Sequence, residues 1–400
     1  MNKVKAKAAI MDRVSKELDL WFEKSETIKE SREYETELIN TAFNITQSIT
    51  KNSLGDVPSN RNKKRKILTC FGIFEISKSH VLCKHTKKFG ISSKLQEIIC
   101  YLASESVFEG VATILHDLLR INISAKQVQR VSEYYGQKLE ELEENYQEST
   151  LEVPLVASET SAEPVYVTMD GSMVYTREEE WKEMKVGRIY SENSRIPIQK
   201  DRTIVMDSIY TCTFGNNKEF LKKLDPYIEP YKHKVFIADG AKWIWNWVET
   251  FYGLSVQILD FYHAVEKLSA YATLAYKDAG ERRQWLDVQK QRLKSDEVEK
   301  VIEDLKNTTT KTTETNKALN DVIRYYENNI DRMKYGTFIA KGYLIGSGAI
   351  ESAHRNVIQQ RLKLSGQRWS IVGAQNIANL RAYKKSNRWE TLIQEIKKAA

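Results

Sequence analysis

The stretch VYVTMDGS (165–172) joins a run of apolar and β-branched residues to an Asp-Gly pair. KVFIADGAKWIW (234–245) and VQILDFYHA (256–264) repeat this pattern, each with an aspartate at the end of the run. Short apolar runs of this kind predict buried strands, so Asp170 and Asp239 are placed where a strand passes into a loop. Functional groups of open α/β sheets gather at such positions. The three stretches therefore predict an α/β core with carboxylates at its strand ends.

Further elements of this core lie on both sides of the three stretches. Residues 181–190 alternate well enough for a strand paired with the first one, and residues 203–214 also have strand character. GYLIGSGAIESAHRNVIQQRLK (342–363) predicts a helix with Ser347 as its N-cap. Glu351 then falls near the first turn, where free backbone N–H groups favour anions.

Two strand-end aspartates and a helix-borne glutamate are the ingredients of a two-metal phosphoryl-transfer site. Carboxylate oxygens suit Mg²⁺, and two such ions stabilise the attacking and leaving oxygens of an in-line displacement. Asp-Gly is also ordinary turn chemistry, so any one aspartate is more often a turn or cap residue than a ligand. Asp260 ends the third strand and competes with Asp239 for the role of ligand on pattern alone.

The length and the charge of the chain indicate how many domains it has and what kind of partner it binds. The 400 residues suggest two to four domains, and a hydrophobic content of 41% is sufficient for sizeable cores. The net charge of +7 is uneven, because residues 61–90 and 341–400 each have a net charge of +8 and the remainder is −9. Two basic segments on an acidic body indicate a negatively charged partner, with DNA or RNA as the first candidate. No proline follows Pro230, which favours helices in the last 170 residues.

Several classes of protein are disfavoured by what the sequence lacks. The first 21 residues contain no apolar signal-peptide core, and no run of about 18 apolar residues appears. The four cysteines form no CxxC pair, and the sequence contains no Walker loop, dinucleotide fingerprint, HExxH or GxSxG motif. We therefore expect a soluble, intracellular protein that does not bind membranes.

The N-terminal part of the chain predicts a DNA-binding region. Residues 1–50 show helical periodicity, and residues 67–83 predict a small basic hairpin. Residues 108–119 predict a helix with an apolar stripe of Val111, Leu115 and Leu118.

Ser124 is a plausible N-cap for a second helix, with Val128, Val131 and Tyr135 turned inward. This is helix-turn-helix geometry, although a helical pair with a solvated polar face fits the pattern nearly as well. The exposed face of the second helix would contain Lys126, Gln127, Gln129 and Arg130.

A second basic stretch follows the glutamate-bearing helix. Lys363, Arg368 and Trp369 predict a phosphate-binding track beside the active site, and Arg381 is a weaker candidate for the same role. A solvated helix face is the alternative. Trp243 and Trp247 lie one helical turn apart, facing Phe251, and are expected in the core rather than as a base-stacking platform.

The sequence resembles a known family, the Mutator-like DDE transposases of bacterial insertion sequences, most closely the ISKra subgroup. The resemblance rests on four blocks in order, at residues 169–190, 236–245, 258–268 and 346–381. It implies an RNase H-like catalytic core interrupted by an all-α insertion, preceded by a mainly helical DNA-binding region with a helix-turn-helix.

The resemblance also implies site residues and their roles. The catalytic triad falls on Asp170, Asp239 and Glu351, with Asp170 shared between two Mg²⁺ ions (Mn²⁺ as a possible substitute). The family signature of an Asp or Cys two residues from a His matches Asp260 and His263. His263 could orient a carboxylate or contact the scissile phosphate, and a structural hydrogen bond is equally compatible.

These expectations give a domain plan. It comprises an N-terminal helical segment (1–60), the hairpin and helix-turn-helix region (61–155), the first part of the core (160–269), the helical insertion (270–336), the glutamate-bearing part of the core (337–381) and a basic tail (382–400).

The expected function is that of a DNA transposase, which binds element ends and catalyses Mg²⁺-dependent phosphodiester hydrolysis and strand transfer. The alternatives are a metal-dependent nuclease with the same core and a catalytically inactive DNA-binding protein. The expected partners are double-stranded DNA, as element ends and target, and further copies of the chain in a homodimer or higher oligomer on DNA. No heptad seam identifies the oligomeric state in the sequence. The expected location is the bacterial cytoplasm, with nucleoid association when bound to DNA.

Overall fold

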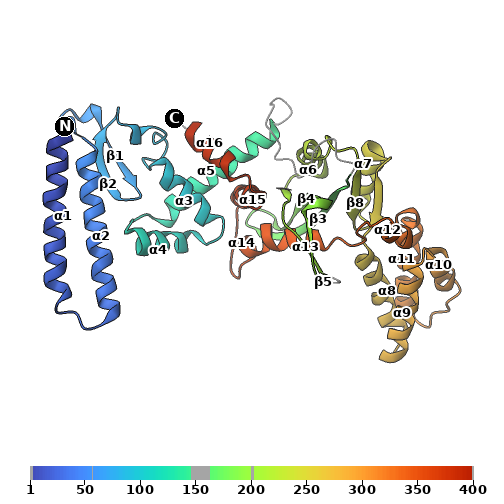
Figure 1. Ribbon diagram of the computed structural model, residues 1–400. Coiled ribbons are helices and arrows are strands. Elements are labelled where there is room, and N and C mark those ends of the chain that lie inside the picture. Colours follow the sequence, from blue (N-terminus) through green and yellow to red (C-terminus); the bar gives the residue numbers. More distant parts are fainter. Residues whose placement is uncertain (1–2, 56, 146–162, 200–201, 399–400) are drawn as a thin grey trace. The chain divides into compact units, whose positions relative to one another are not determined.

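The computed structural model describes residues 3–55, 57–145, 163–199 and 202–398 (Figure 1). The chain divides into two compact units. The first unit combines Met1–Glu140 with Trp389–Ala400, and the second unit is Glu141–Arg388. Most of the loop expected at 157–164 lies outside the described residues.

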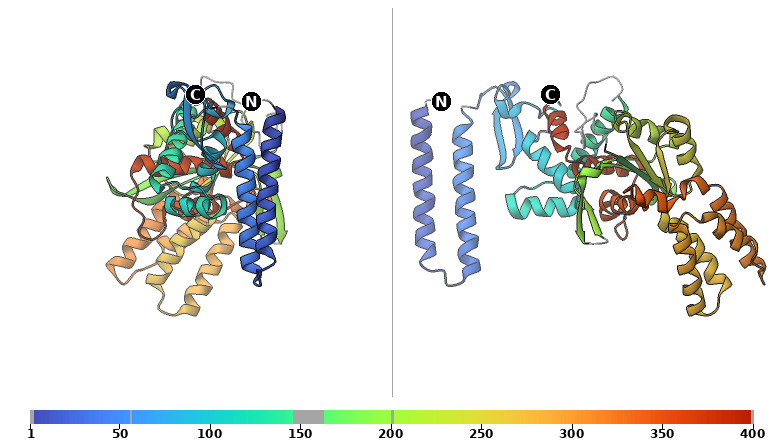
Figure 2. Two further views of the ribbon diagram at one scale, coloured as in Figure 1. Left: turned by 90° about the vertical axis from the view of Figure 1, so that its left-hand side faces the viewer. Right: turned by 45° about the vertical axis from the view of Figure 1, so that its right-hand side comes forward.

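The first unit begins with two long antiparallel helices, α1 (Lys3–Ser25) and α2 (Ser31–Ser53), which lie side by side in every view (Figures 1 and 2). The ring of Trp21 meets that of Tyr34 edge to face, with centroids 5.6 Å apart. The Asn44 side chain donates to Glu17 across the pair. The helices predicted for the first 50 residues are therefore present.

A β-hairpin follows, formed by β1 (Lys64–Thr69) and β2 (Gly72–Ser77). Gly72 has a φ of +111°, a value that favours glycine in the tight turn between the strands. Ile67 and Ile76 are buried in a small core of their own. The hairpin predicted from the β-branched residues is confirmed, although it begins at Lys64, three residues before the predicted stretch.

Three helices and the C-terminal helix complete the first unit. They are α3 (Ser93–Ala103), α4 (Phe108–Leu119), α5 (Ala125–Glu144) and α16 (Trp389–Lys398). The ring of Trp389 meets that of Tyr101 on α3 edge to face, at 5.5 Å. The C-terminal helix therefore packs with residues from the first part of the chain.

Helices α4 and α5 agree with the predicted pair in most details. The Ser124 hydroxyl accepts a hydrogen bond from the Gln127 N–H at 3.2 Å, so it caps α5 as expected. The predicted inward residues of both helices are buried, with one exception. Leu118 is 74% exposed, so its place in the apolar stripe of α4 was wrong. Leu118 lies in the last turn of α4, which ends at Leu119 and is followed by Arg120 in the left-handed conformation.

The second unit is built on a mixed five-stranded sheet in the order β7-β4-β3-β8-β9. Strands β3, β8 and β9 are parallel, whereas β4 runs antiparallel to both β3 and β7. The strands are β3 (Val165–Thr176), β4 (Glu180–Ser191), β7 (Ile209–Thr213), β8 (Lys234–Ala238) and β9 (Val256–Leu259). A separate two-stranded ribbon comprises β5 (Arg195–Gln199) and β6 (Arg202–Val205). The predicted α/β core is thus confirmed at this level. The prediction that the first strand ends at Asp170 was wrong, because β3 continues through Asp170 to Thr176 and remains paired with β4.

Helices pack against this sheet and bury its apolar residues. They include α6 (Asn217–Leu224), α7 (Lys242–Tyr252), α8 (Phe261–Ala275) and α15 (Ile371–Lys385). Trp247 lies in the core and Trp243 packs against it, as predicted. Phe251, one turn after Trp247 on α7, is largely exposed and lies outside this core.

A helical region separates β9 from the glutamate-bearing helix. It contains the second half of α8 followed by α9 (Ala279–Lys294), α10 (Val298–Lys306), α11 (Thr313–Glu327) and α12 (Tyr335–Ala340). The chain then forms α13 (Gly348–Ala353), a π-helical segment (His354–Gln359) and α14 (Gln360–Leu362). Residues 270–336 are therefore mainly helical, in agreement with their periodicity, and the Thr-rich stretch at 308–315 includes the turn before α11.

Candidate functional site

Asp170 lies in β3, just beyond the part of the strand that pairs with β8. The last pair of that parallel ladder is Thr168 with Ile237. Asp170 Oδ1 accepts from the N–H of Gly171 at 2.7 Å, and Oδ2 lies 3.1 Å from Nε2 of His354. The carboxylate is therefore held in place from two directions.

Asp239 follows the last residue of β8. Because Thr168 is paired with Ile237, two more residues along each strand bring Asp170 and Asp239 to neighbouring positions at the carboxyl ends. Burial raises the pKa of the Asp239 carboxyl above its usual value. The N–H of Ala241, 3.0 Å from Oδ1, opposes this increase, and the negative charge of Asp170 adds to it.

Glu351 projects from α13 into a cleft that it shares with Asp170. The cleft has a volume of about 800 Å³, and Ser172, Ser352 and His354 also line it. The glutamate side chain is exposed. Ser347 occupies the N-cap position as predicted, but its side chain caps no N–H among the described residues.

The structure thus brings the three predicted carboxylates into partial proximity. Asp170 is the common member, because it neighbours Asp239 beyond the end of the β3–β8 ladder and lines the same cleft as Glu351. Among the described residues, no group of three or more His, Cys, Asp or Glu side chains has an arrangement that could hold a metal ion.

Asp260 has a position unlike that of the other carboxylates. It is 2% exposed and begins α8, where Oδ1 accepts from the N–H of His263 at 2.8 Å. Its Oδ2 accepts from the N–H of Ser347, immediately before α13. Both oxygens are therefore used to join the start of α8 to the start of the glutamate-bearing helix.

His263 lies between Asp260 and the strand-end carboxylates. Its Nδ1 is 3.4 Å from Asp260 Oδ1, an ion-pair separation that lacks hydrogen-bond geometry. The Asp260 carboxylate raises the pKa of His263 to about 9, against the effect of burial, and Asp239 and Asp170 add to the increase. At neutral pH, His263 is therefore a cation beside the acidic strand ends.

His354 is a candidate site residue that the sequence reasoning missed. It is buried, and within the part of the chain that the structure describes its Nδ1 has no hydrogen-bond partner. It follows Glu351 by three residues, a spacing that places both side chains on one face of a helix. This spacing is the feature of the sequence from which His354 could have been predicted as a site residue.

The π-helical segment that contains His354 is held by a buried arginine. Arg381 is fully buried, and its Nε donates to the carbonyl of Val357 at 2.8 Å, while Nη2 donates to the carbonyl of Asn356. A π-helical turn changes the pairing of backbone carbonyls, and such turns are frequent at functional sites. Arg381 therefore has a structural role here and is not part of an exposed phosphate track.

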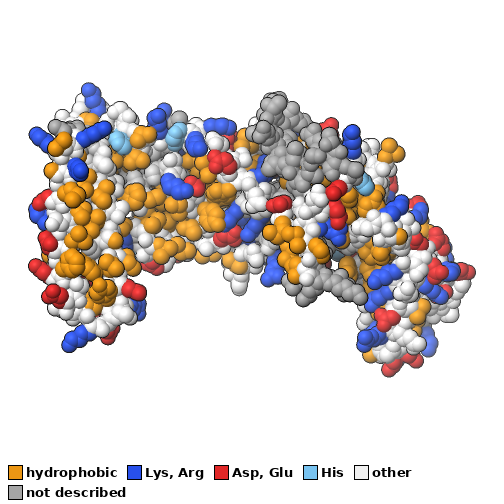
Figure 3. Space-filling view, in the orientation of Figure 1, with side chains coloured by type: hydrophobic (Ala, Val, Ile, Leu, Met, Phe, Trp, Pro, Cys, Tyr) orange, Lys and Arg blue, Asp and Glu red, His pale blue; other side chains and the backbone are white. Residues whose placement is uncertain are grey.

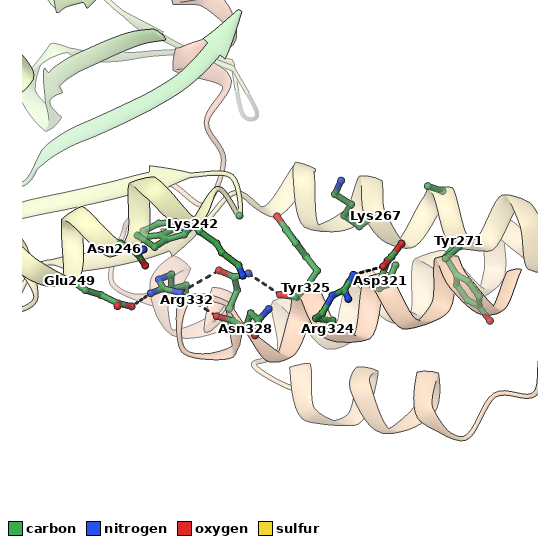
Figure 4. A pocket seen from close by; sticks show the side chains of 16 residues that line it. Lys242, Asn246, Glu249, Lys267, Tyr271, Asp321, Arg324, Tyr325, Asn328 and Arg332 are labelled. Carbon is green, nitrogen blue, oxygen red and sulfur yellow. Dashed lines mark hydrogen bonds and ion pairs between the residues drawn. The ribbon is translucent and has the colours of Figure 1, made fainter. Parts of the chain in front are cut away.

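A second cavity lies between α7, α8 and α11 and is also lined by Gly240, the residue after Asp239 (Figure 4). Its volume is about 810 Å³. Tyr325 of α11 packs against Gly240, the residue after Asp239, and Lys267 of α8 lies with its Nζ 5.8 Å from the centre of the Tyr325 ring. The positive charge of Lys267 favours the ionised form of Asp239 and lowers its pKa. Lys267 and Tyr325 were not identified from the sequence.

The predicted DNA-binding residues differ in their accessibility. Lys126, Gln127 and Arg130 are exposed on α5, whereas Gln129 is half-buried and donates to Glu133 at 2.7 Å. These positions agree with an outward polar face on the second helix of the pair.

The stretch after α14 is less open than predicted. Lys363 is exposed, and its Nζ donates to Ser172 in the cleft at 2.9 Å. Arg368 is exposed, but Trp369 is only 7% exposed and forms a β-bridge with Thr176 at the end of β3. The guanidinium of Arg361 covers its ring at 4.8 Å. Trp369 thus anchors this stretch to the sheet, and its placement on an open DNA-contacting surface was wrong.

Comparisons with known proteins gave no match, either to a protein-family model or to a curated protein sequence. Within the described ranges, no helix is both long and apolar enough to cross a membrane.

Proposed function

We propose that this chain is a DDE transposase of a bacterial insertion sequence, with an RNase H-like core in its second unit. The observation that carries the proposal is the placement of Asp170 next to Asp239, just beyond the point where the parallel pairing of β3 with β8 stops, together with the cleft that Asp170 and Glu351 both line. A mixed sheet in which β7, β4 and β3 are joined by antiparallel pairing and β8 and β9 run parallel to β3 is compatible with such a core.

Carboxylate oxygens are the type of donor that Mg²⁺ or Mn²⁺ takes, although no three His, Cys, Asp or Glu side chains of the described residues surround one ion position before DNA binds. Burial and the negative charge of Asp170 both raise the pKa of Asp239, and a bound cation would offset both effects. Asp170, Asp239 and Glu351 would provide the hard oxygen ligands. When bound, such ions supply an activated water and stabilisation of the leaving oxygen in phosphodiester cleavage.

The protein's own groups prepare the site in three ways. His354 fixes Asp170 Oδ2, and the Gly171 N–H fixes Oδ1. His263 provides positive charge close to both strand-end aspartates. Lys363 brings an ammonium group to the Ser172 side of the cleft, where a DNA phosphate would gain a charge-assisted contact.

The first unit would supply recognition of the element ends. Helices α4 and α5, joined by residues 120–124, have the order of a helix-turn-helix, with Lys126 and Arg130 exposed on the second helix. The hairpin of β1 and β2 belongs to the basic segment 61–90, which would contact phosphates without reading sequence. Such a protein would act in the bacterial cytoplasm and associate with the nucleoid through DNA.

The decisive experiment is a metal-dependent cleavage assay on DNA that contains the element's own flanking ends. Asp239→Asn and Glu351→Gln should abolish cleavage while retaining DNA binding, because each replaces a carboxylate by a neutral amide of nearly the same volume. Asp331→Asn, at a highly exposed carboxylate outside the site, is the matched control and should cleave normally. Full cleavage by either site variant would refute the proposed assignment.

The same assay separates the proposed function from its alternatives. A transposase joins the freed 3′ end to target DNA, so joined products should accumulate when target DNA is added. A nuclease with this core would release ends without joining them. A catalytically inactive DNA-binding protein would bind the ends and produce neither product.

A further inference from the structure

The α1–α2 hairpin exposes an apolar stripe on each of its helices. On α1 the positions are 4, 8, 11, 15, 18 and 22, which lie within an arc of about 80° and of which only Ser15 is polar. Four of them are exposed large apolar residues, namely Val4, Met11, Leu18 and Phe22. On α2 the positions are 38, 42, 45 and 49, with Leu38 and Ile49 exposed.

These stripes are distinct from the surface through which the two helices contact each other. Residues of α1 that face α2, such as Ile10, Val14 and Trp21, are half-buried and lie about 100° around the helix from the centre of the exposed stripe. The stripes of α1 and α2 form one apolar face, and Figure 3 shows hydrophobic side chains gathered over both helices. A two-helix hairpin with a second apolar face has half of the core of a four-helix bundle.

The charge of the hairpin is polarised along its length. Residues 19–37, at the closed end, have a net charge of −4, whereas residues 3–18 and 38–53 together have a net charge of +4. A second identical hairpin placed antiparallel would bring each acidic end to a basic end. A parallel arrangement would bring like charges together.

The size of this face is sufficient for a stable contact. Helices of 23 residues are about 35 Å long, and two side by side are about 20 Å wide, so each copy would contribute roughly 700 Å². A standard stable interface buries about 800 Å² per partner.

We propose that the α1–α2 hairpin docks antiparallel onto the hairpin of a second copy of this chain, forming an intermolecular four-helix bundle. The contact is isologous, so each stripe meets its counterpart around a twofold axis near the middle of the hairpin. This interface needs neither DNA nor metal, and its test is independent of the transposase proposal.

The first experiment measures the oligomeric state of the full chain by sedimentation equilibrium, without DNA and with EDTA present. The wild type should be a dimer at micromolar concentration, and Met11→Glu or Ile49→Glu should raise the dimer dissociation constant at least tenfold. Leu20→Glu is the matched control, because Leu20 is 54% exposed on the opposite side of α1 and should leave the dimer unchanged. Circular dichroism should show unchanged helix content in all three variants.

The second experiment tests the orientation by disulfide crosslinking in a Cys70→Ser background, in which the three remaining cysteines are buried. A mixture of Val4→Cys and Phe22→Cys chains should form a mixed disulfide. Val4→Cys chains alone should not crosslink, because the two introduced thiols would be about 30 Å apart. A monomeric wild type, or a dimer unaffected by Met11→Glu and Ile49→Glu, would overturn the proposal. Efficient crosslinking of Val4→Cys alone would overturn the antiparallel arrangement.

Discussion

His354 Nε2 lies 3.1 Å from Oδ2 of Asp170, and this contact joins the π-helical segment to the central strand of the sheet. A carboxylate only accepts hydrogen bonds, so the contact requires the proton of His354 on Nε2. The histidine therefore orients an aspartate whose other neighbours are Asp239 and the Glu351 cleft. Its position makes a specific prediction about activity.

We expect His354→Ala to lower metal-dependent cleavage by about 10- to 100-fold, the range typical of residues that orient a metal ligand. His354→Gln, which can still donate to Asp170, should recover part of this loss. The Mn²⁺ concentration that gives half-maximal cleavage is the discriminating measurement, and it should increase in His354→Ala. An unchanged Mn²⁺ requirement would show that the contact does not orient a metal ligand.

Arg381 should be important for stability. Its replacement by Met leaves the carbonyls of Asn356 and Val357 buried without this donor, at a cost of about 1–3 kcal/mol for each. Urea unfolding should therefore show a clear decrease in the free energy of unfolding. Arg283→Met, at an arginine whose side chain is 87% exposed, is the matched control and should change stability little.

His263 should make stability depend on pH in the alkaline range. Its folded-state pKa is raised to about 9 from an ordinary value of 6.5, so the folded protein binds its proton more tightly than the unfolded chain does. This contribution is fully present below about pH 6.5 and is lost as the pH rises through about 9. The difference in unfolding free energy between wild type and His263→Asn, measured with EDTA, should thus be larger at pH 6 than at pH 10. An equal difference at both values would contradict the assignment.

Gly240 should tolerate no side chain while Tyr325 is present. A Cβ at Gly240 would lie 2.2 Å from Cε2 of the Tyr325 ring, so Gly240→Ala should destabilise the protein by about 1–3 kcal/mol through overpacking. The double variant Gly240→Ala/Tyr325→Leu should lose less stability than the two single changes predict together. A double-mutant cycle of thermal unfolding measures this coupling. Simple additivity would show that the ring can move aside without cost.

The proposed recognition helix leads to a prediction about salt. If Lys126 and Arg130 contact phosphates, their replacement by Ala should each reduce the slope of log affinity against log salt by about 0.9. Fluorescence anisotropy of labelled element-end DNA between about 50 and 200 mM salt gives this slope. Lys317→Ala, an exposed lysine on α11 in the second unit, is the control. A slope as steep as that of the wild type would exclude phosphate contacts by these two residues.

Local pattern in the sequence determined the elements of this protein. Alternating and β-branched runs predicted the strand that contains Asp170 and the strand that ends before Asp239, and the Ser124 cap and apolar spacing predicted α5. These features depend on short-range backbone preferences and on which face of an element must be buried. Backbone preference and the buried face both follow from residues that are close together in sequence, so these elements could be predicted without knowing what each one packs against.

Only the tertiary structure shows that residues of the same type at similar places in the sequence have different roles. Asp260 and Asp239 each follow a strand. Both carboxylate oxygens of Asp260 accept hydrogen bonds from backbone N–H groups, one from His263 and the other from Ser347, 87 residues later in the sequence. Arg381 and Arg368 both follow the glutamate, but one is buried against the π-helical segment and the other is exposed. Burial and hydrogen-bond partners over such separations depend on how distant segments pack, which local periodicity does not specify.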